Sequence, residues 1–212
     1  MKHKGVLTVV SGFSGAGKGT LMNLLLKTYE NYALSISMTT RAPRPGEENG
    51  REYFFITKEE FEEHIAKDEL IEYAQYVGNY YGTPKAYVEE KLNEGKDVIL
   101  EIEIQGALKI KEKFPEALLL FVTPPNAAEL QKRLKGRGTE TDEVILQRLH
   151  RAAEESEGIE QYDYLVVNDD LNECVQQMHT IIRNAKYAAF RNEEFIQDIR
   201  QELKDLAKGE KI

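Results

Sequence analysis

The chain has 212 residues, of which 41% are hydrophobic, and it carries a formal net charge of -9 at pH 7. This length suits one compact domain with a real core, and the acidic balance argues against non-specific nucleic-acid binding. No apolar stretch is long enough to span a bilayer, and the single cysteine, Cys174, excludes an internal disulfide. We therefore expect a protein of a reducing compartment, by default the cytoplasm.

Strand-like and helix-like patterns alternate along most of the chain. The apolar runs with strand character are GVLTVV (5–10), ALSISM (33–38), DVILEIEI (97–104), ALLLFV (117–122) and YLVV (164–167). Helical patterns occupy 21–29, 126–134 and 170–190. The last of these places seven apolar residues on one face: Leu171, Cys174, Val175, Met178, Ile181, Ile182 and Ala185. This alternation predicts an α/β fold whose parallel sheet is covered on both sides.

Two regions interrupt the alternation. Residues 39–90 combine turns, short strands, a helix with a Thr57–Glu60 capping box and a helix opening at Thr83-Pro84, which together predict a small antiparallel insertion. Between 133 and 149, glycines and arginines lie between two helices, and we interpret Gly136 and Gly138 as hinges. The tail beyond residue 193 has the pattern of an amphipathic helix.

The stretch GFSGAGKGT, between the first strand and the first helix, fits the phosphate-binding pattern G-x-x-x-x-G-K. Glycine lets backbone N–H groups turn toward phosphate oxygens, and the positive end of the helix points to the same place. We expect this loop to bind a nucleoside triphosphate, with Thr20 on the magnesium side. Its residues are Gly12, Phe13, Ser14, Gly15, Ala16, Gly17, Lys18, Gly19 and Thr20. The loop alone does not distinguish switches, motors and small-molecule kinases.

A second group of residues predicts a site for a monophosphate. The segment SISMTTRAPRPGEENGREYFF gathers arginines with a serine, a glutamate and a tyrosine, and paired guanidinium groups match a phosphate. Six strings follow the phosphate-binding loop in order: SISMTTRAPRPGE, YFF, EYAQYVGNYYGT, LEIEIQGA, RLKGRGTET and VVNDDL. Together they resemble the guanylate kinase family over roughly residues 5–188.

The resemblance implies a fold and an activity. The fold is a P-loop nucleotide kinase with a core (1–36, 91–125 and 160–192), a GMP-binding insertion (37–90), a helical lid (126–159) and a C-terminal tail (193–212). The activity is transfer of the γ-phosphoryl group from ATP with Mg²⁺ to GMP, and to dGMP as well. It implies small-molecule substrates, no nucleic acid and no membrane, and it leaves the oligomeric state open.

The resemblance also implies which residues hold GMP. Those for the nucleotide phosphate and its surroundings are Ser37, Arg41, Arg44, Glu47, Tyr53 and Tyr81. Glu72 and Thr83 read the base, and the chemistry agrees, since a carboxylate accepts hydrogen bonds from both N1–H and the N2 amino group of guanine. Glu101 and Glu103 alternate along one predicted strand and so face one side. They are assigned to the GMP site, while a magnesium shell or a structural ion pair remain alternatives.

The residues expected to act on the transferred phosphoryl group are Lys18, Arg133, Arg137 and Arg148. The family's lid arginines close over the triphosphate, where positive groups stabilise the charge of the transition state. Asn168, after the last strand, is implied to lie near the adenine of ATP.

Three alternatives remain at this point. One is a non-catalytic guanylate-kinase-like domain that binds proteins, although Lys18 and the lid arginines are present. Another is a kinase for a different nucleoside monophosphate, against which Glu72 and Thr83 argue. The third is a nucleotide-hydrolysing switch, for which the acceptor site would have no purpose.

Overall fold

The computed structural model describes residues 4–76, 78–136 and 141–208. Its centre is a parallel sheet with the strand order β2-β7-β1-β8-β9. The strands are β1 (Leu7–Gly12), β2 (Tyr32–Leu34), β7 (Asp97–Glu101), β8 (Leu118–Thr123) and β9 (Tyr164–Val167). Because β1 lies between β7 and β8, the loop that follows β1 leaves the sheet at the middle of its carboxyl edge, where open α/β sheets bind ligands.

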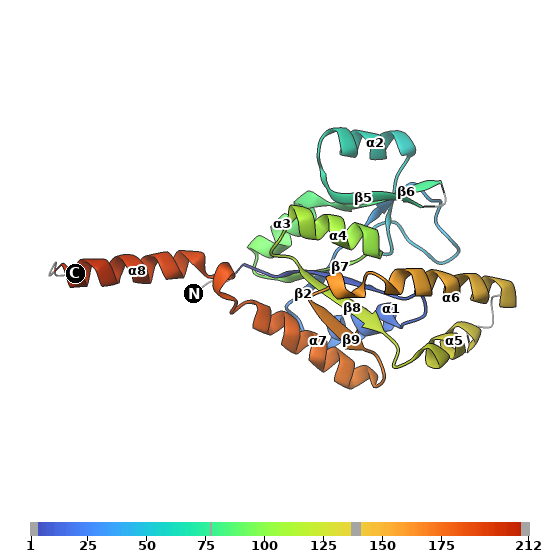
Figure 1. Ribbon diagram of the computed structural model, residues 1–212. Coiled ribbons are helices and arrows are strands. Elements are labelled where there is room, and N and C mark those ends of the chain that lie inside the picture. The colour runs from blue at the N-terminus through green and yellow to red at the C-terminus, as the bar shows by residue number, and fades with distance from the viewer. Residues whose placement is uncertain (1–3, 77, 137–140, 209–212) are drawn as a thin grey trace.

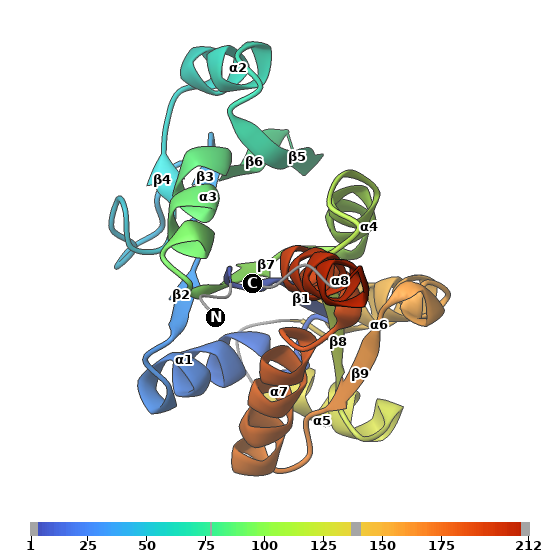
Figure 2. The ribbon, with the colours of Figure 1, turned by 90° about the vertical axis from the view of Figure 1, so that its left-hand side faces the viewer.

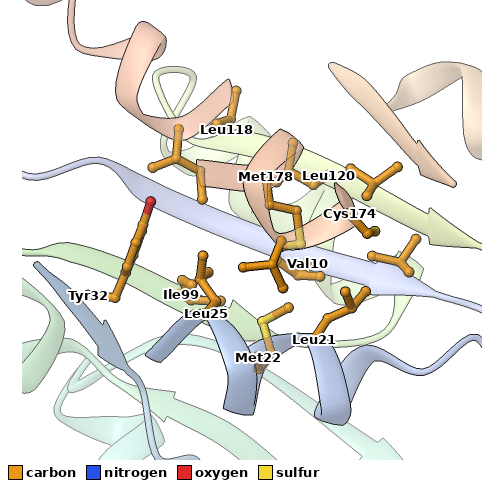
Figure 3. Close-up of a cluster of buried hydrophobic side chains, with 14 of the residues drawn as sticks. Val10, Leu21, Met22, Leu25, Tyr32, Ile99, Leu118, Leu120, Cys174 and Met178 are labelled. Carbon is orange, nitrogen blue, oxygen red and sulfur yellow. The ribbon is translucent and has the colours of Figure 1, made fainter. Parts of the chain in front are cut away.

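Helices cover both faces of this sheet, which confirms the predicted fold class. α1 (Lys18–Thr28) and α7 (Leu171–Ala185) lie on one face, and α3 (Lys85–Asn93) and α4 (Ile104–Lys113) lie on the other (Figure 2). Figure 3 shows the core between α1, α7 and the sheet, where Met178 and Cys174 approach Val10 and Leu21. All seven apolar positions predicted for the helix over 170–190 pack in this core.

A second sheet, with the strand order β4-β3-β6-β5, lies in the region after residue 39, where the alternation of strands and helices was expected to be interrupted. Its elements are β3 (Met38–Thr39), β4 (Phe54–Phe55), α2 (Lys58–Ala66), β5 (Leu70–Tyr76) and β6 (Asn79–Pro84). The predicted capping box is present, with Thr57 accepting from the backbone N–H of Glu60. The β3–β6 and β5–β6 pairs are antiparallel as predicted, whereas β3 and β4 are parallel.

Two predicted strand runs contain strands but have the wrong bounds. The run over 33–38 divides into β2 and β3, which belong to different sheets, so the chain crosses from one sheet to the other at Ser35–Ser37. The run over 97–104 ends at Glu101, because Glu103 caps α4 and the chain turns into a helix. The helix α4 was not predicted, since the apolar alternation of its first residues continues the pattern of the strand.

The remaining helices follow β8 and β9. They are α5 (Ala127–Gly136), α6 (Asp142–Ser156), the short 3-10 helices η1 (Ile159–Gln161) and η2 (Ala189–Arg191), and α8 (Glu193–Ala207). Asn126 caps α5 as expected, through the backbone N–H of Glu129. Gly136 ends α5, whereas Gly138 lies outside the described residues. α8 extends away from the rest of the molecule (Figure 1).

Candidate functional site

The glycine loop joins β1 to α1 and leaves the first turn of α1 open. Gly15 and Gly17 have φ angles of 92° and 91°, which glycine adopts without strain. A Cβ on Gly12 would lie 2.1 Å from the carbonyl oxygen of Val122, so only glycine fits against β8. Gly17 is the N-cap of α1 and has no side chain to occupy the first N–H groups of the helix. The loop therefore presents a helix N-terminus without a side-chain cap to an anion.

Lys18 bends back over the loop that precedes it. Its Nζ donates to the carbonyl oxygens of Gly12 at 2.8 Å and Phe13 at 3.3 Å. Both are weak neutral partners that phosphate oxygens can replace. Lys18 also lines a cavity of about 420 Å³ that opens between the loop and the second sheet.

Asn168 and Arg133 hold the loop from behind. The buried Asn168 amide donates to the carbonyl oxygen of Ala16 at 2.8 Å. Arg133 donates to Asn168 O at 2.9 Å and to Ala16 O at 3.4 Å, and Glu129 accepts from its Nε at 2.9 Å. A Cβ on Gly17 would lie 2.5 Å from the Asn168 amide nitrogen. The structure thus places Arg133 and Asn168 against the loop, and Arg133 is not among the residues that line the cavity.

Arg148 reaches the cavity from α6. Its Nη1 donates to the Ser14 hydroxyl at 3.0 Å, which joins α6 to the tip of the glycine loop. Arg137, which was expected to act beside Arg148, lies outside the described residues.

Beside Tyr53, which lines the other end of the cavity, Arg41 is held in place by a carboxylate and two rings. Its Nη2 donates to both carboxylate oxygens of Glu47, at 3.0 and 2.9 Å. The guanidinium lies 5.4 Å from the ring centre of Tyr53 and 5.7 Å from that of Phe55. Hydrogen bonds to Glu47 from the backbone N–H of Arg44 and from the Arg41 side chain hold the pKa of its carboxyl below the usual range.

Tyr53 and Tyr81 form the wall beside Arg41. Their ring centres are 5.9 Å apart at 71°, and both residues line the cavity together with Ser37. The hydroxyl-bearing rings and a fixed guanidinium make a group of donors suited to a single phosphate. Arg44 is exposed, and Arg41, Arg44, Glu47 and Thr83 are not among the cavity-lining residues.

Glu72 and Thr83 form a buried pair on adjacent strands of the second sheet. Thr83 Oγ1 donates to Glu72 Oε1 at 2.8 Å, and Glu72 is only 6% exposed. Burial raises the pKa of Glu72 to about 7, partly offset by the Thr83 hydrogen bond. A Cβ on Gly106 would lie 3.4 Å from Glu72 Oε2, so Gly106 keeps space open beside the second carboxylate oxygen. Glu72 lines the cavity and can accept hydrogen bonds from a ligand there.

The two carboxylates Glu101 and Glu103 do not lie on one strand as predicted. Glu101 is the last residue of β7, and burial raises its pKa while the charge of Lys18 lowers it. Glu103 is the N-cap of α4 and accepts from the backbone N–H groups of Gln105 at 3.1 Å and Gly106 at 2.8 Å. Both residues still line the cavity. Glu101 therefore faces the glycine loop, whereas the oxygens of Glu103 are taken up by helix amides.

Sequence reasoning missed two cavity residues on α6. Arg151 and Glu155 line the cavity beside Arg148, and Glu155 Oε1 accepts from Arg151 Nε at 2.8 Å. Their spacing was the available signal, because Arg151 lies one turn after Arg148 and Glu155 one turn after Arg151.

Three comparisons relate this geometry to known proteins. Residues 4–185 match the family model described as "Guanylate kinase". A protein named "Guanylate kinase" from Halalkalibacterium halodurans is 53% identical over 181 residues, which cover 85% of this chain and 89% of that one. One of the same name from Lactococcus lactis is 50% identical, covering 88% and 91%. The crystal structure of guanylate kinase from Anaplasma phagocytophilum superposes with a TM-score of 0.71 at 36% identity, over 87% of this chain and 88% of the other.

Within the described residues, no helix combines the length and the apolarity that crossing a bilayer requires.

Proposed function

This chain belongs to the guanylate kinase family, and from that premise we propose which of its residues carry out the transfer of the terminal phosphoryl group of ATP to GMP. The enzyme acts on two small molecules, ATP and GMP, and forms ADP and GDP. The observation that carries the residue assignment is the single cavity that joins Lys18 to the buried Glu72.

The donor site is the glycine loop. Its backbone N–H groups and the N-terminus of α1 receive the phosphates of ATP, and Lys18 exchanges its carbonyl partners for phosphate oxygens. Arg133 and Asn168 fix the loop from behind, and Asn168 lies on the side where adenine is expected. This assignment gives Arg133 a supporting role in holding the loop rather than direct contact with the transferred group.

The acceptor phosphate binds between Arg41, Tyr53 and Tyr81. Glu47 holds the Arg41 guanidinium in one orientation before the ligand arrives, which lowers the entropy lost on binding. Ser37, at the crossing between the two sheets, brings a hydroxyl to the same group. Arg44 is exposed in this structure, and its proposed contact requires its side chain to turn toward the cavity.

Glu72 selects guanine. Thr83 occupies one carboxylate oxygen and the space beside Gly106 lets the base approach the other. Guanine presents two adjacent donors, N1–H and the N2 amino group, whereas adenine presents a bare acceptor at N1. A site built on such hydrogen bonds rejects a base that leaves the carboxylate unpaired.

Phosphoryl transfer needs no general base from the protein. The acceptor is a phosphate monoester with a second pKa of about 6, so it is mostly a dianion at neutral pH. Lys18 and Arg148 surround the space between the two sites and stabilise negative charge in the transition state. Arg137 is proposed to join them from the lid.

The oxygen donors present fit Mg²⁺, which proteins commonly hold through one or two side-chain oxygens and substrate phosphates. Thr20, in the first turn of α1, and Glu101, at the end of β7, would hold it. When bound, it neutralises charge on the transferred phosphates. The part of the chain that the structure describes contains no cluster of three or more His, Cys, Asp or Glu residues for a metal, so a magnesium site here depends on the nucleotide.

We assign the enzyme to purine nucleotide metabolism and to the cytoplasm, where a lone thiol stays reduced. The test is ADP release from ATP and Mg²⁺ with GMP, dGMP, AMP, UMP and CMP offered in turn. Rapid turnover with GMP that is lost in Lys18→Ala supports the assignment, whereas turnover with AMP as fast as with GMP would overturn the role of Glu72.

A further inference from the structure

No step of the phosphoryl transfer uses two of the side chains in the cavity. Arg151 and Glu155, both on α6, line the cavity that joins Lys18 to Glu72. Glu155 Oε1 accepts from Arg151 Nε at 2.8 Å, and the side chains are 46% exposed for Arg151 and 20% exposed for Glu155. An ion pair one turn apart on an accessible helix face adds little to stability. A cation that stays half exposed beside a ligand cavity is instead placed to meet the ligand.

Arg151 lies toward the end of the cavity that receives the base. A second cavity of about 670 Å³ adjoins the first, and residues of the phosphate end such as Lys18, Tyr81 and Arg148 do not line it. Five residues line both cavities: Ala74, Glu103, Ile104, Arg151 and Glu155. α6 lies below α4 in both ribbon views (Figures 1 and 2), and the shared residues mark where these two helices and β5 meet.

The wall shared by the two cavities adjoins the second carboxylate oxygen of Glu72. Ala74 follows Glu72 by two residues on β5, and both line the first cavity. Ile104 belongs to the first turn of α4 together with Gly106, where an added Cβ would lie 3.4 Å from Glu72 Oε2. Arg151 therefore borders the space in which a base bound to Glu72 must lie.

We propose that Arg151 reads the edge of guanine that Glu72 does not contact, donating from its two Nη groups to O6 and N7. The inference rests on the proposed guanine site at Glu72, because a base that presents N1–H and N2 to that carboxylate turns N7 away from it. The guanidinium fork of an arginine matches O6 and N7 of guanine bidentately. Adenine carries an amino donor in place of O6, so its edge would set a donor against Arg151.

Glu155 is a positioning residue in this arrangement. It holds Arg151 Nε, so the plane of the guanidinium is set before the nucleotide arrives and the Nη groups carry the contact. Fixing a long side chain beforehand lowers the entropy lost on binding. Glu47 does the same for Arg41 beside the phosphate. Both ends of the acceptor nucleotide thus meet an arginine that a carboxylate holds.

The phosphates are a poorer partner for Arg151. Arg148, one turn earlier, donates to Ser14 of the glycine loop, so α6 meets the phosphate end through Arg148. The backbone of Arg151 lies about 4.5 Å further along the helix. Its side chain lines the second cavity, which no residue of the glycine loop lines.

The contact is measured with 7-deaza-GMP, in which a C–H group replaces the N7 acceptor. We expect kcat/KM of the native enzyme to be roughly tenfold higher for GMP than for 7-deaza-GMP, the value of one hydrogen bond to a charged donor. In Arg151→Met this ratio should fall to about one, while the KM for ATP stays the same. Arg183→Met is the matched control, because it removes an exposed arginine of α7 that lines neither cavity, and it should keep the native ratio. The ratio is internal to each preparation, so a partly unfolded variant does not change it.

Two results overturn the role of Arg151. One is a native enzyme that uses both nucleotides equally well, and the other is an unchanged ratio in Arg151→Met, which would place the guanidinium on a phosphate instead. Inosine monophosphate tests Glu72 separately, since it keeps O6 and N7 but lacks the N2 amino group. A native enzyme that accepts it as readily as GMP overturns the guanine site itself, whereas an intact preference against it with an unchanged 7-deaza ratio overturns only the role of Arg151.

The positioning role of Glu155 is measured by a double-mutant cycle. Glu155→Gln should lower the preference for GMP over 7-deaza-GMP part of the way to one. Arg151→Met combined with Glu155→Gln should behave like Arg151→Met alone. Glu143→Gln, exposed in the first turn of α6, is the control and should keep the native ratio. A further loss of kcat/KM when Glu155→Gln is added to Arg151→Met contradicts a role through the arginine.

Discussion

The proposed donor half and the proposed acceptor half of the cavity are built in opposite ways. The donor half consists of backbone groups within one continuous stretch, Gly12 to Thr20, between β1 and α1. The acceptor half consists of side chains such as Ser37, Tyr53 and Glu72, which come from separate segments in and next to the second sheet. A site made of backbone groups depends on glycines, which have no side chain to block those groups. A site made of side chains depends on the identity of each side chain. Substitutions should therefore act differently in the two halves.

The largest effect is expected at the one side chain on which the donor half depends. Lys18→Ala removes the only lysine that lines the cavity among the described residues. Turnover should fall by about 10³-fold, because a preorganised cation is lost from the transition state. Initial rates with saturating ATP and GMP measure this. Lys27→Ala, an exposed lysine on the same helix, is the control, and a similar loss there would mean that charge on α1 rather than contact with phosphate is responsible.

A substitution that preserves shape tests the acceptor half. Glu72→Gln replaces one acceptor oxygen by a donor, which then faces the donors of guanine. The kcat/KM for GMP should fall by up to about 10²-fold, the value of a hydrogen bond to a charged group, while the KM for ATP stays the same. Steady-state kinetics with each substrate varied in turn measure this. Glu69→Gln, exposed just before the same strand, should change neither constant, and an equal loss for both substrates would remove Glu72 from base recognition.

Adding a single carbon tests whether the donor half depends on empty space. Gly17→Ala would place a Cβ 2.5 Å from the Asn168 amide at a φ of 91°. The strain should cost about 2 kcal/mol, seen as a fall in the free energy of unfolding and weaker ATP binding by calorimetry. Gly19→Ala is the matched control, because nothing lies within 4 Å of its added carbon. If the two variants behave alike, the close approach of Asn168 does not constrain the loop.

The smallest effect is a pH dependence confined to the acceptor half. In its proposed role Glu72 must be ionised to accept hydrogen bonds from both donors of guanine, and burial raises its pKa to about 7. Its carboxyl binds a proton as the pH falls through 7, so the KM for GMP should rise about tenfold between pH 8 and pH 6. The phosphate of GMP also titrates near 6. Glu72→Gln has no titrating group at position 72, so the change of KM with pH in this variant measures the contribution of the substrate. The part of the rise in KM that is missing in Glu72→Gln is attributable to Glu72. A rise in KM of the same size in the native enzyme and in the variant contradicts this role.

The two halves also differ in how far the sequence predicts them. The glycine loop was predicted from its own nine residues, because the elements that position it adjoin it in the chain. Alternating patterns likewise predicted the parallel sheet and the apolar face of α7, because a helix that packs on one face shows this as a local periodicity in its sequence. Glu72 was placed in the site only through the family resemblance, because its surroundings depend on α4, which lies about thirty residues further along the chain, as well as on the neighbouring strand β6.

The sequence failed where a pattern with a period of two ran past the end of its strand. In VILEIEI, apolar and acidic residues alternate from Leu100 to Ile104, yet the backbone leaves the sheet after Glu101 because the Glu103 carboxylate accepts hydrogen bonds from the first amides of α4. The helix cap, rather than the strand-like alternation, therefore determined the local structure. In the same way, Arg151 and Glu155 resembled any solvated helix pair until the fold placed α6 beside the cavity.

The cap at Glu103 has a consequence for any functional screen of this enzyme. Loss of that carboxylate would loosen the beginning of α4, and with it Gly106, whose bare backbone keeps the space next to Glu72 clear. A variant at position 103 would then resemble a nucleotide-recognition defect although the altered atom need never meet the nucleotide. Aspartate, one methylene shorter, distinguishes the two causes because it remains a good helix cap. Activity that survives in Glu103→Asp and disappears in Glu103→Ala shows that the residue acts by supporting the start of α4.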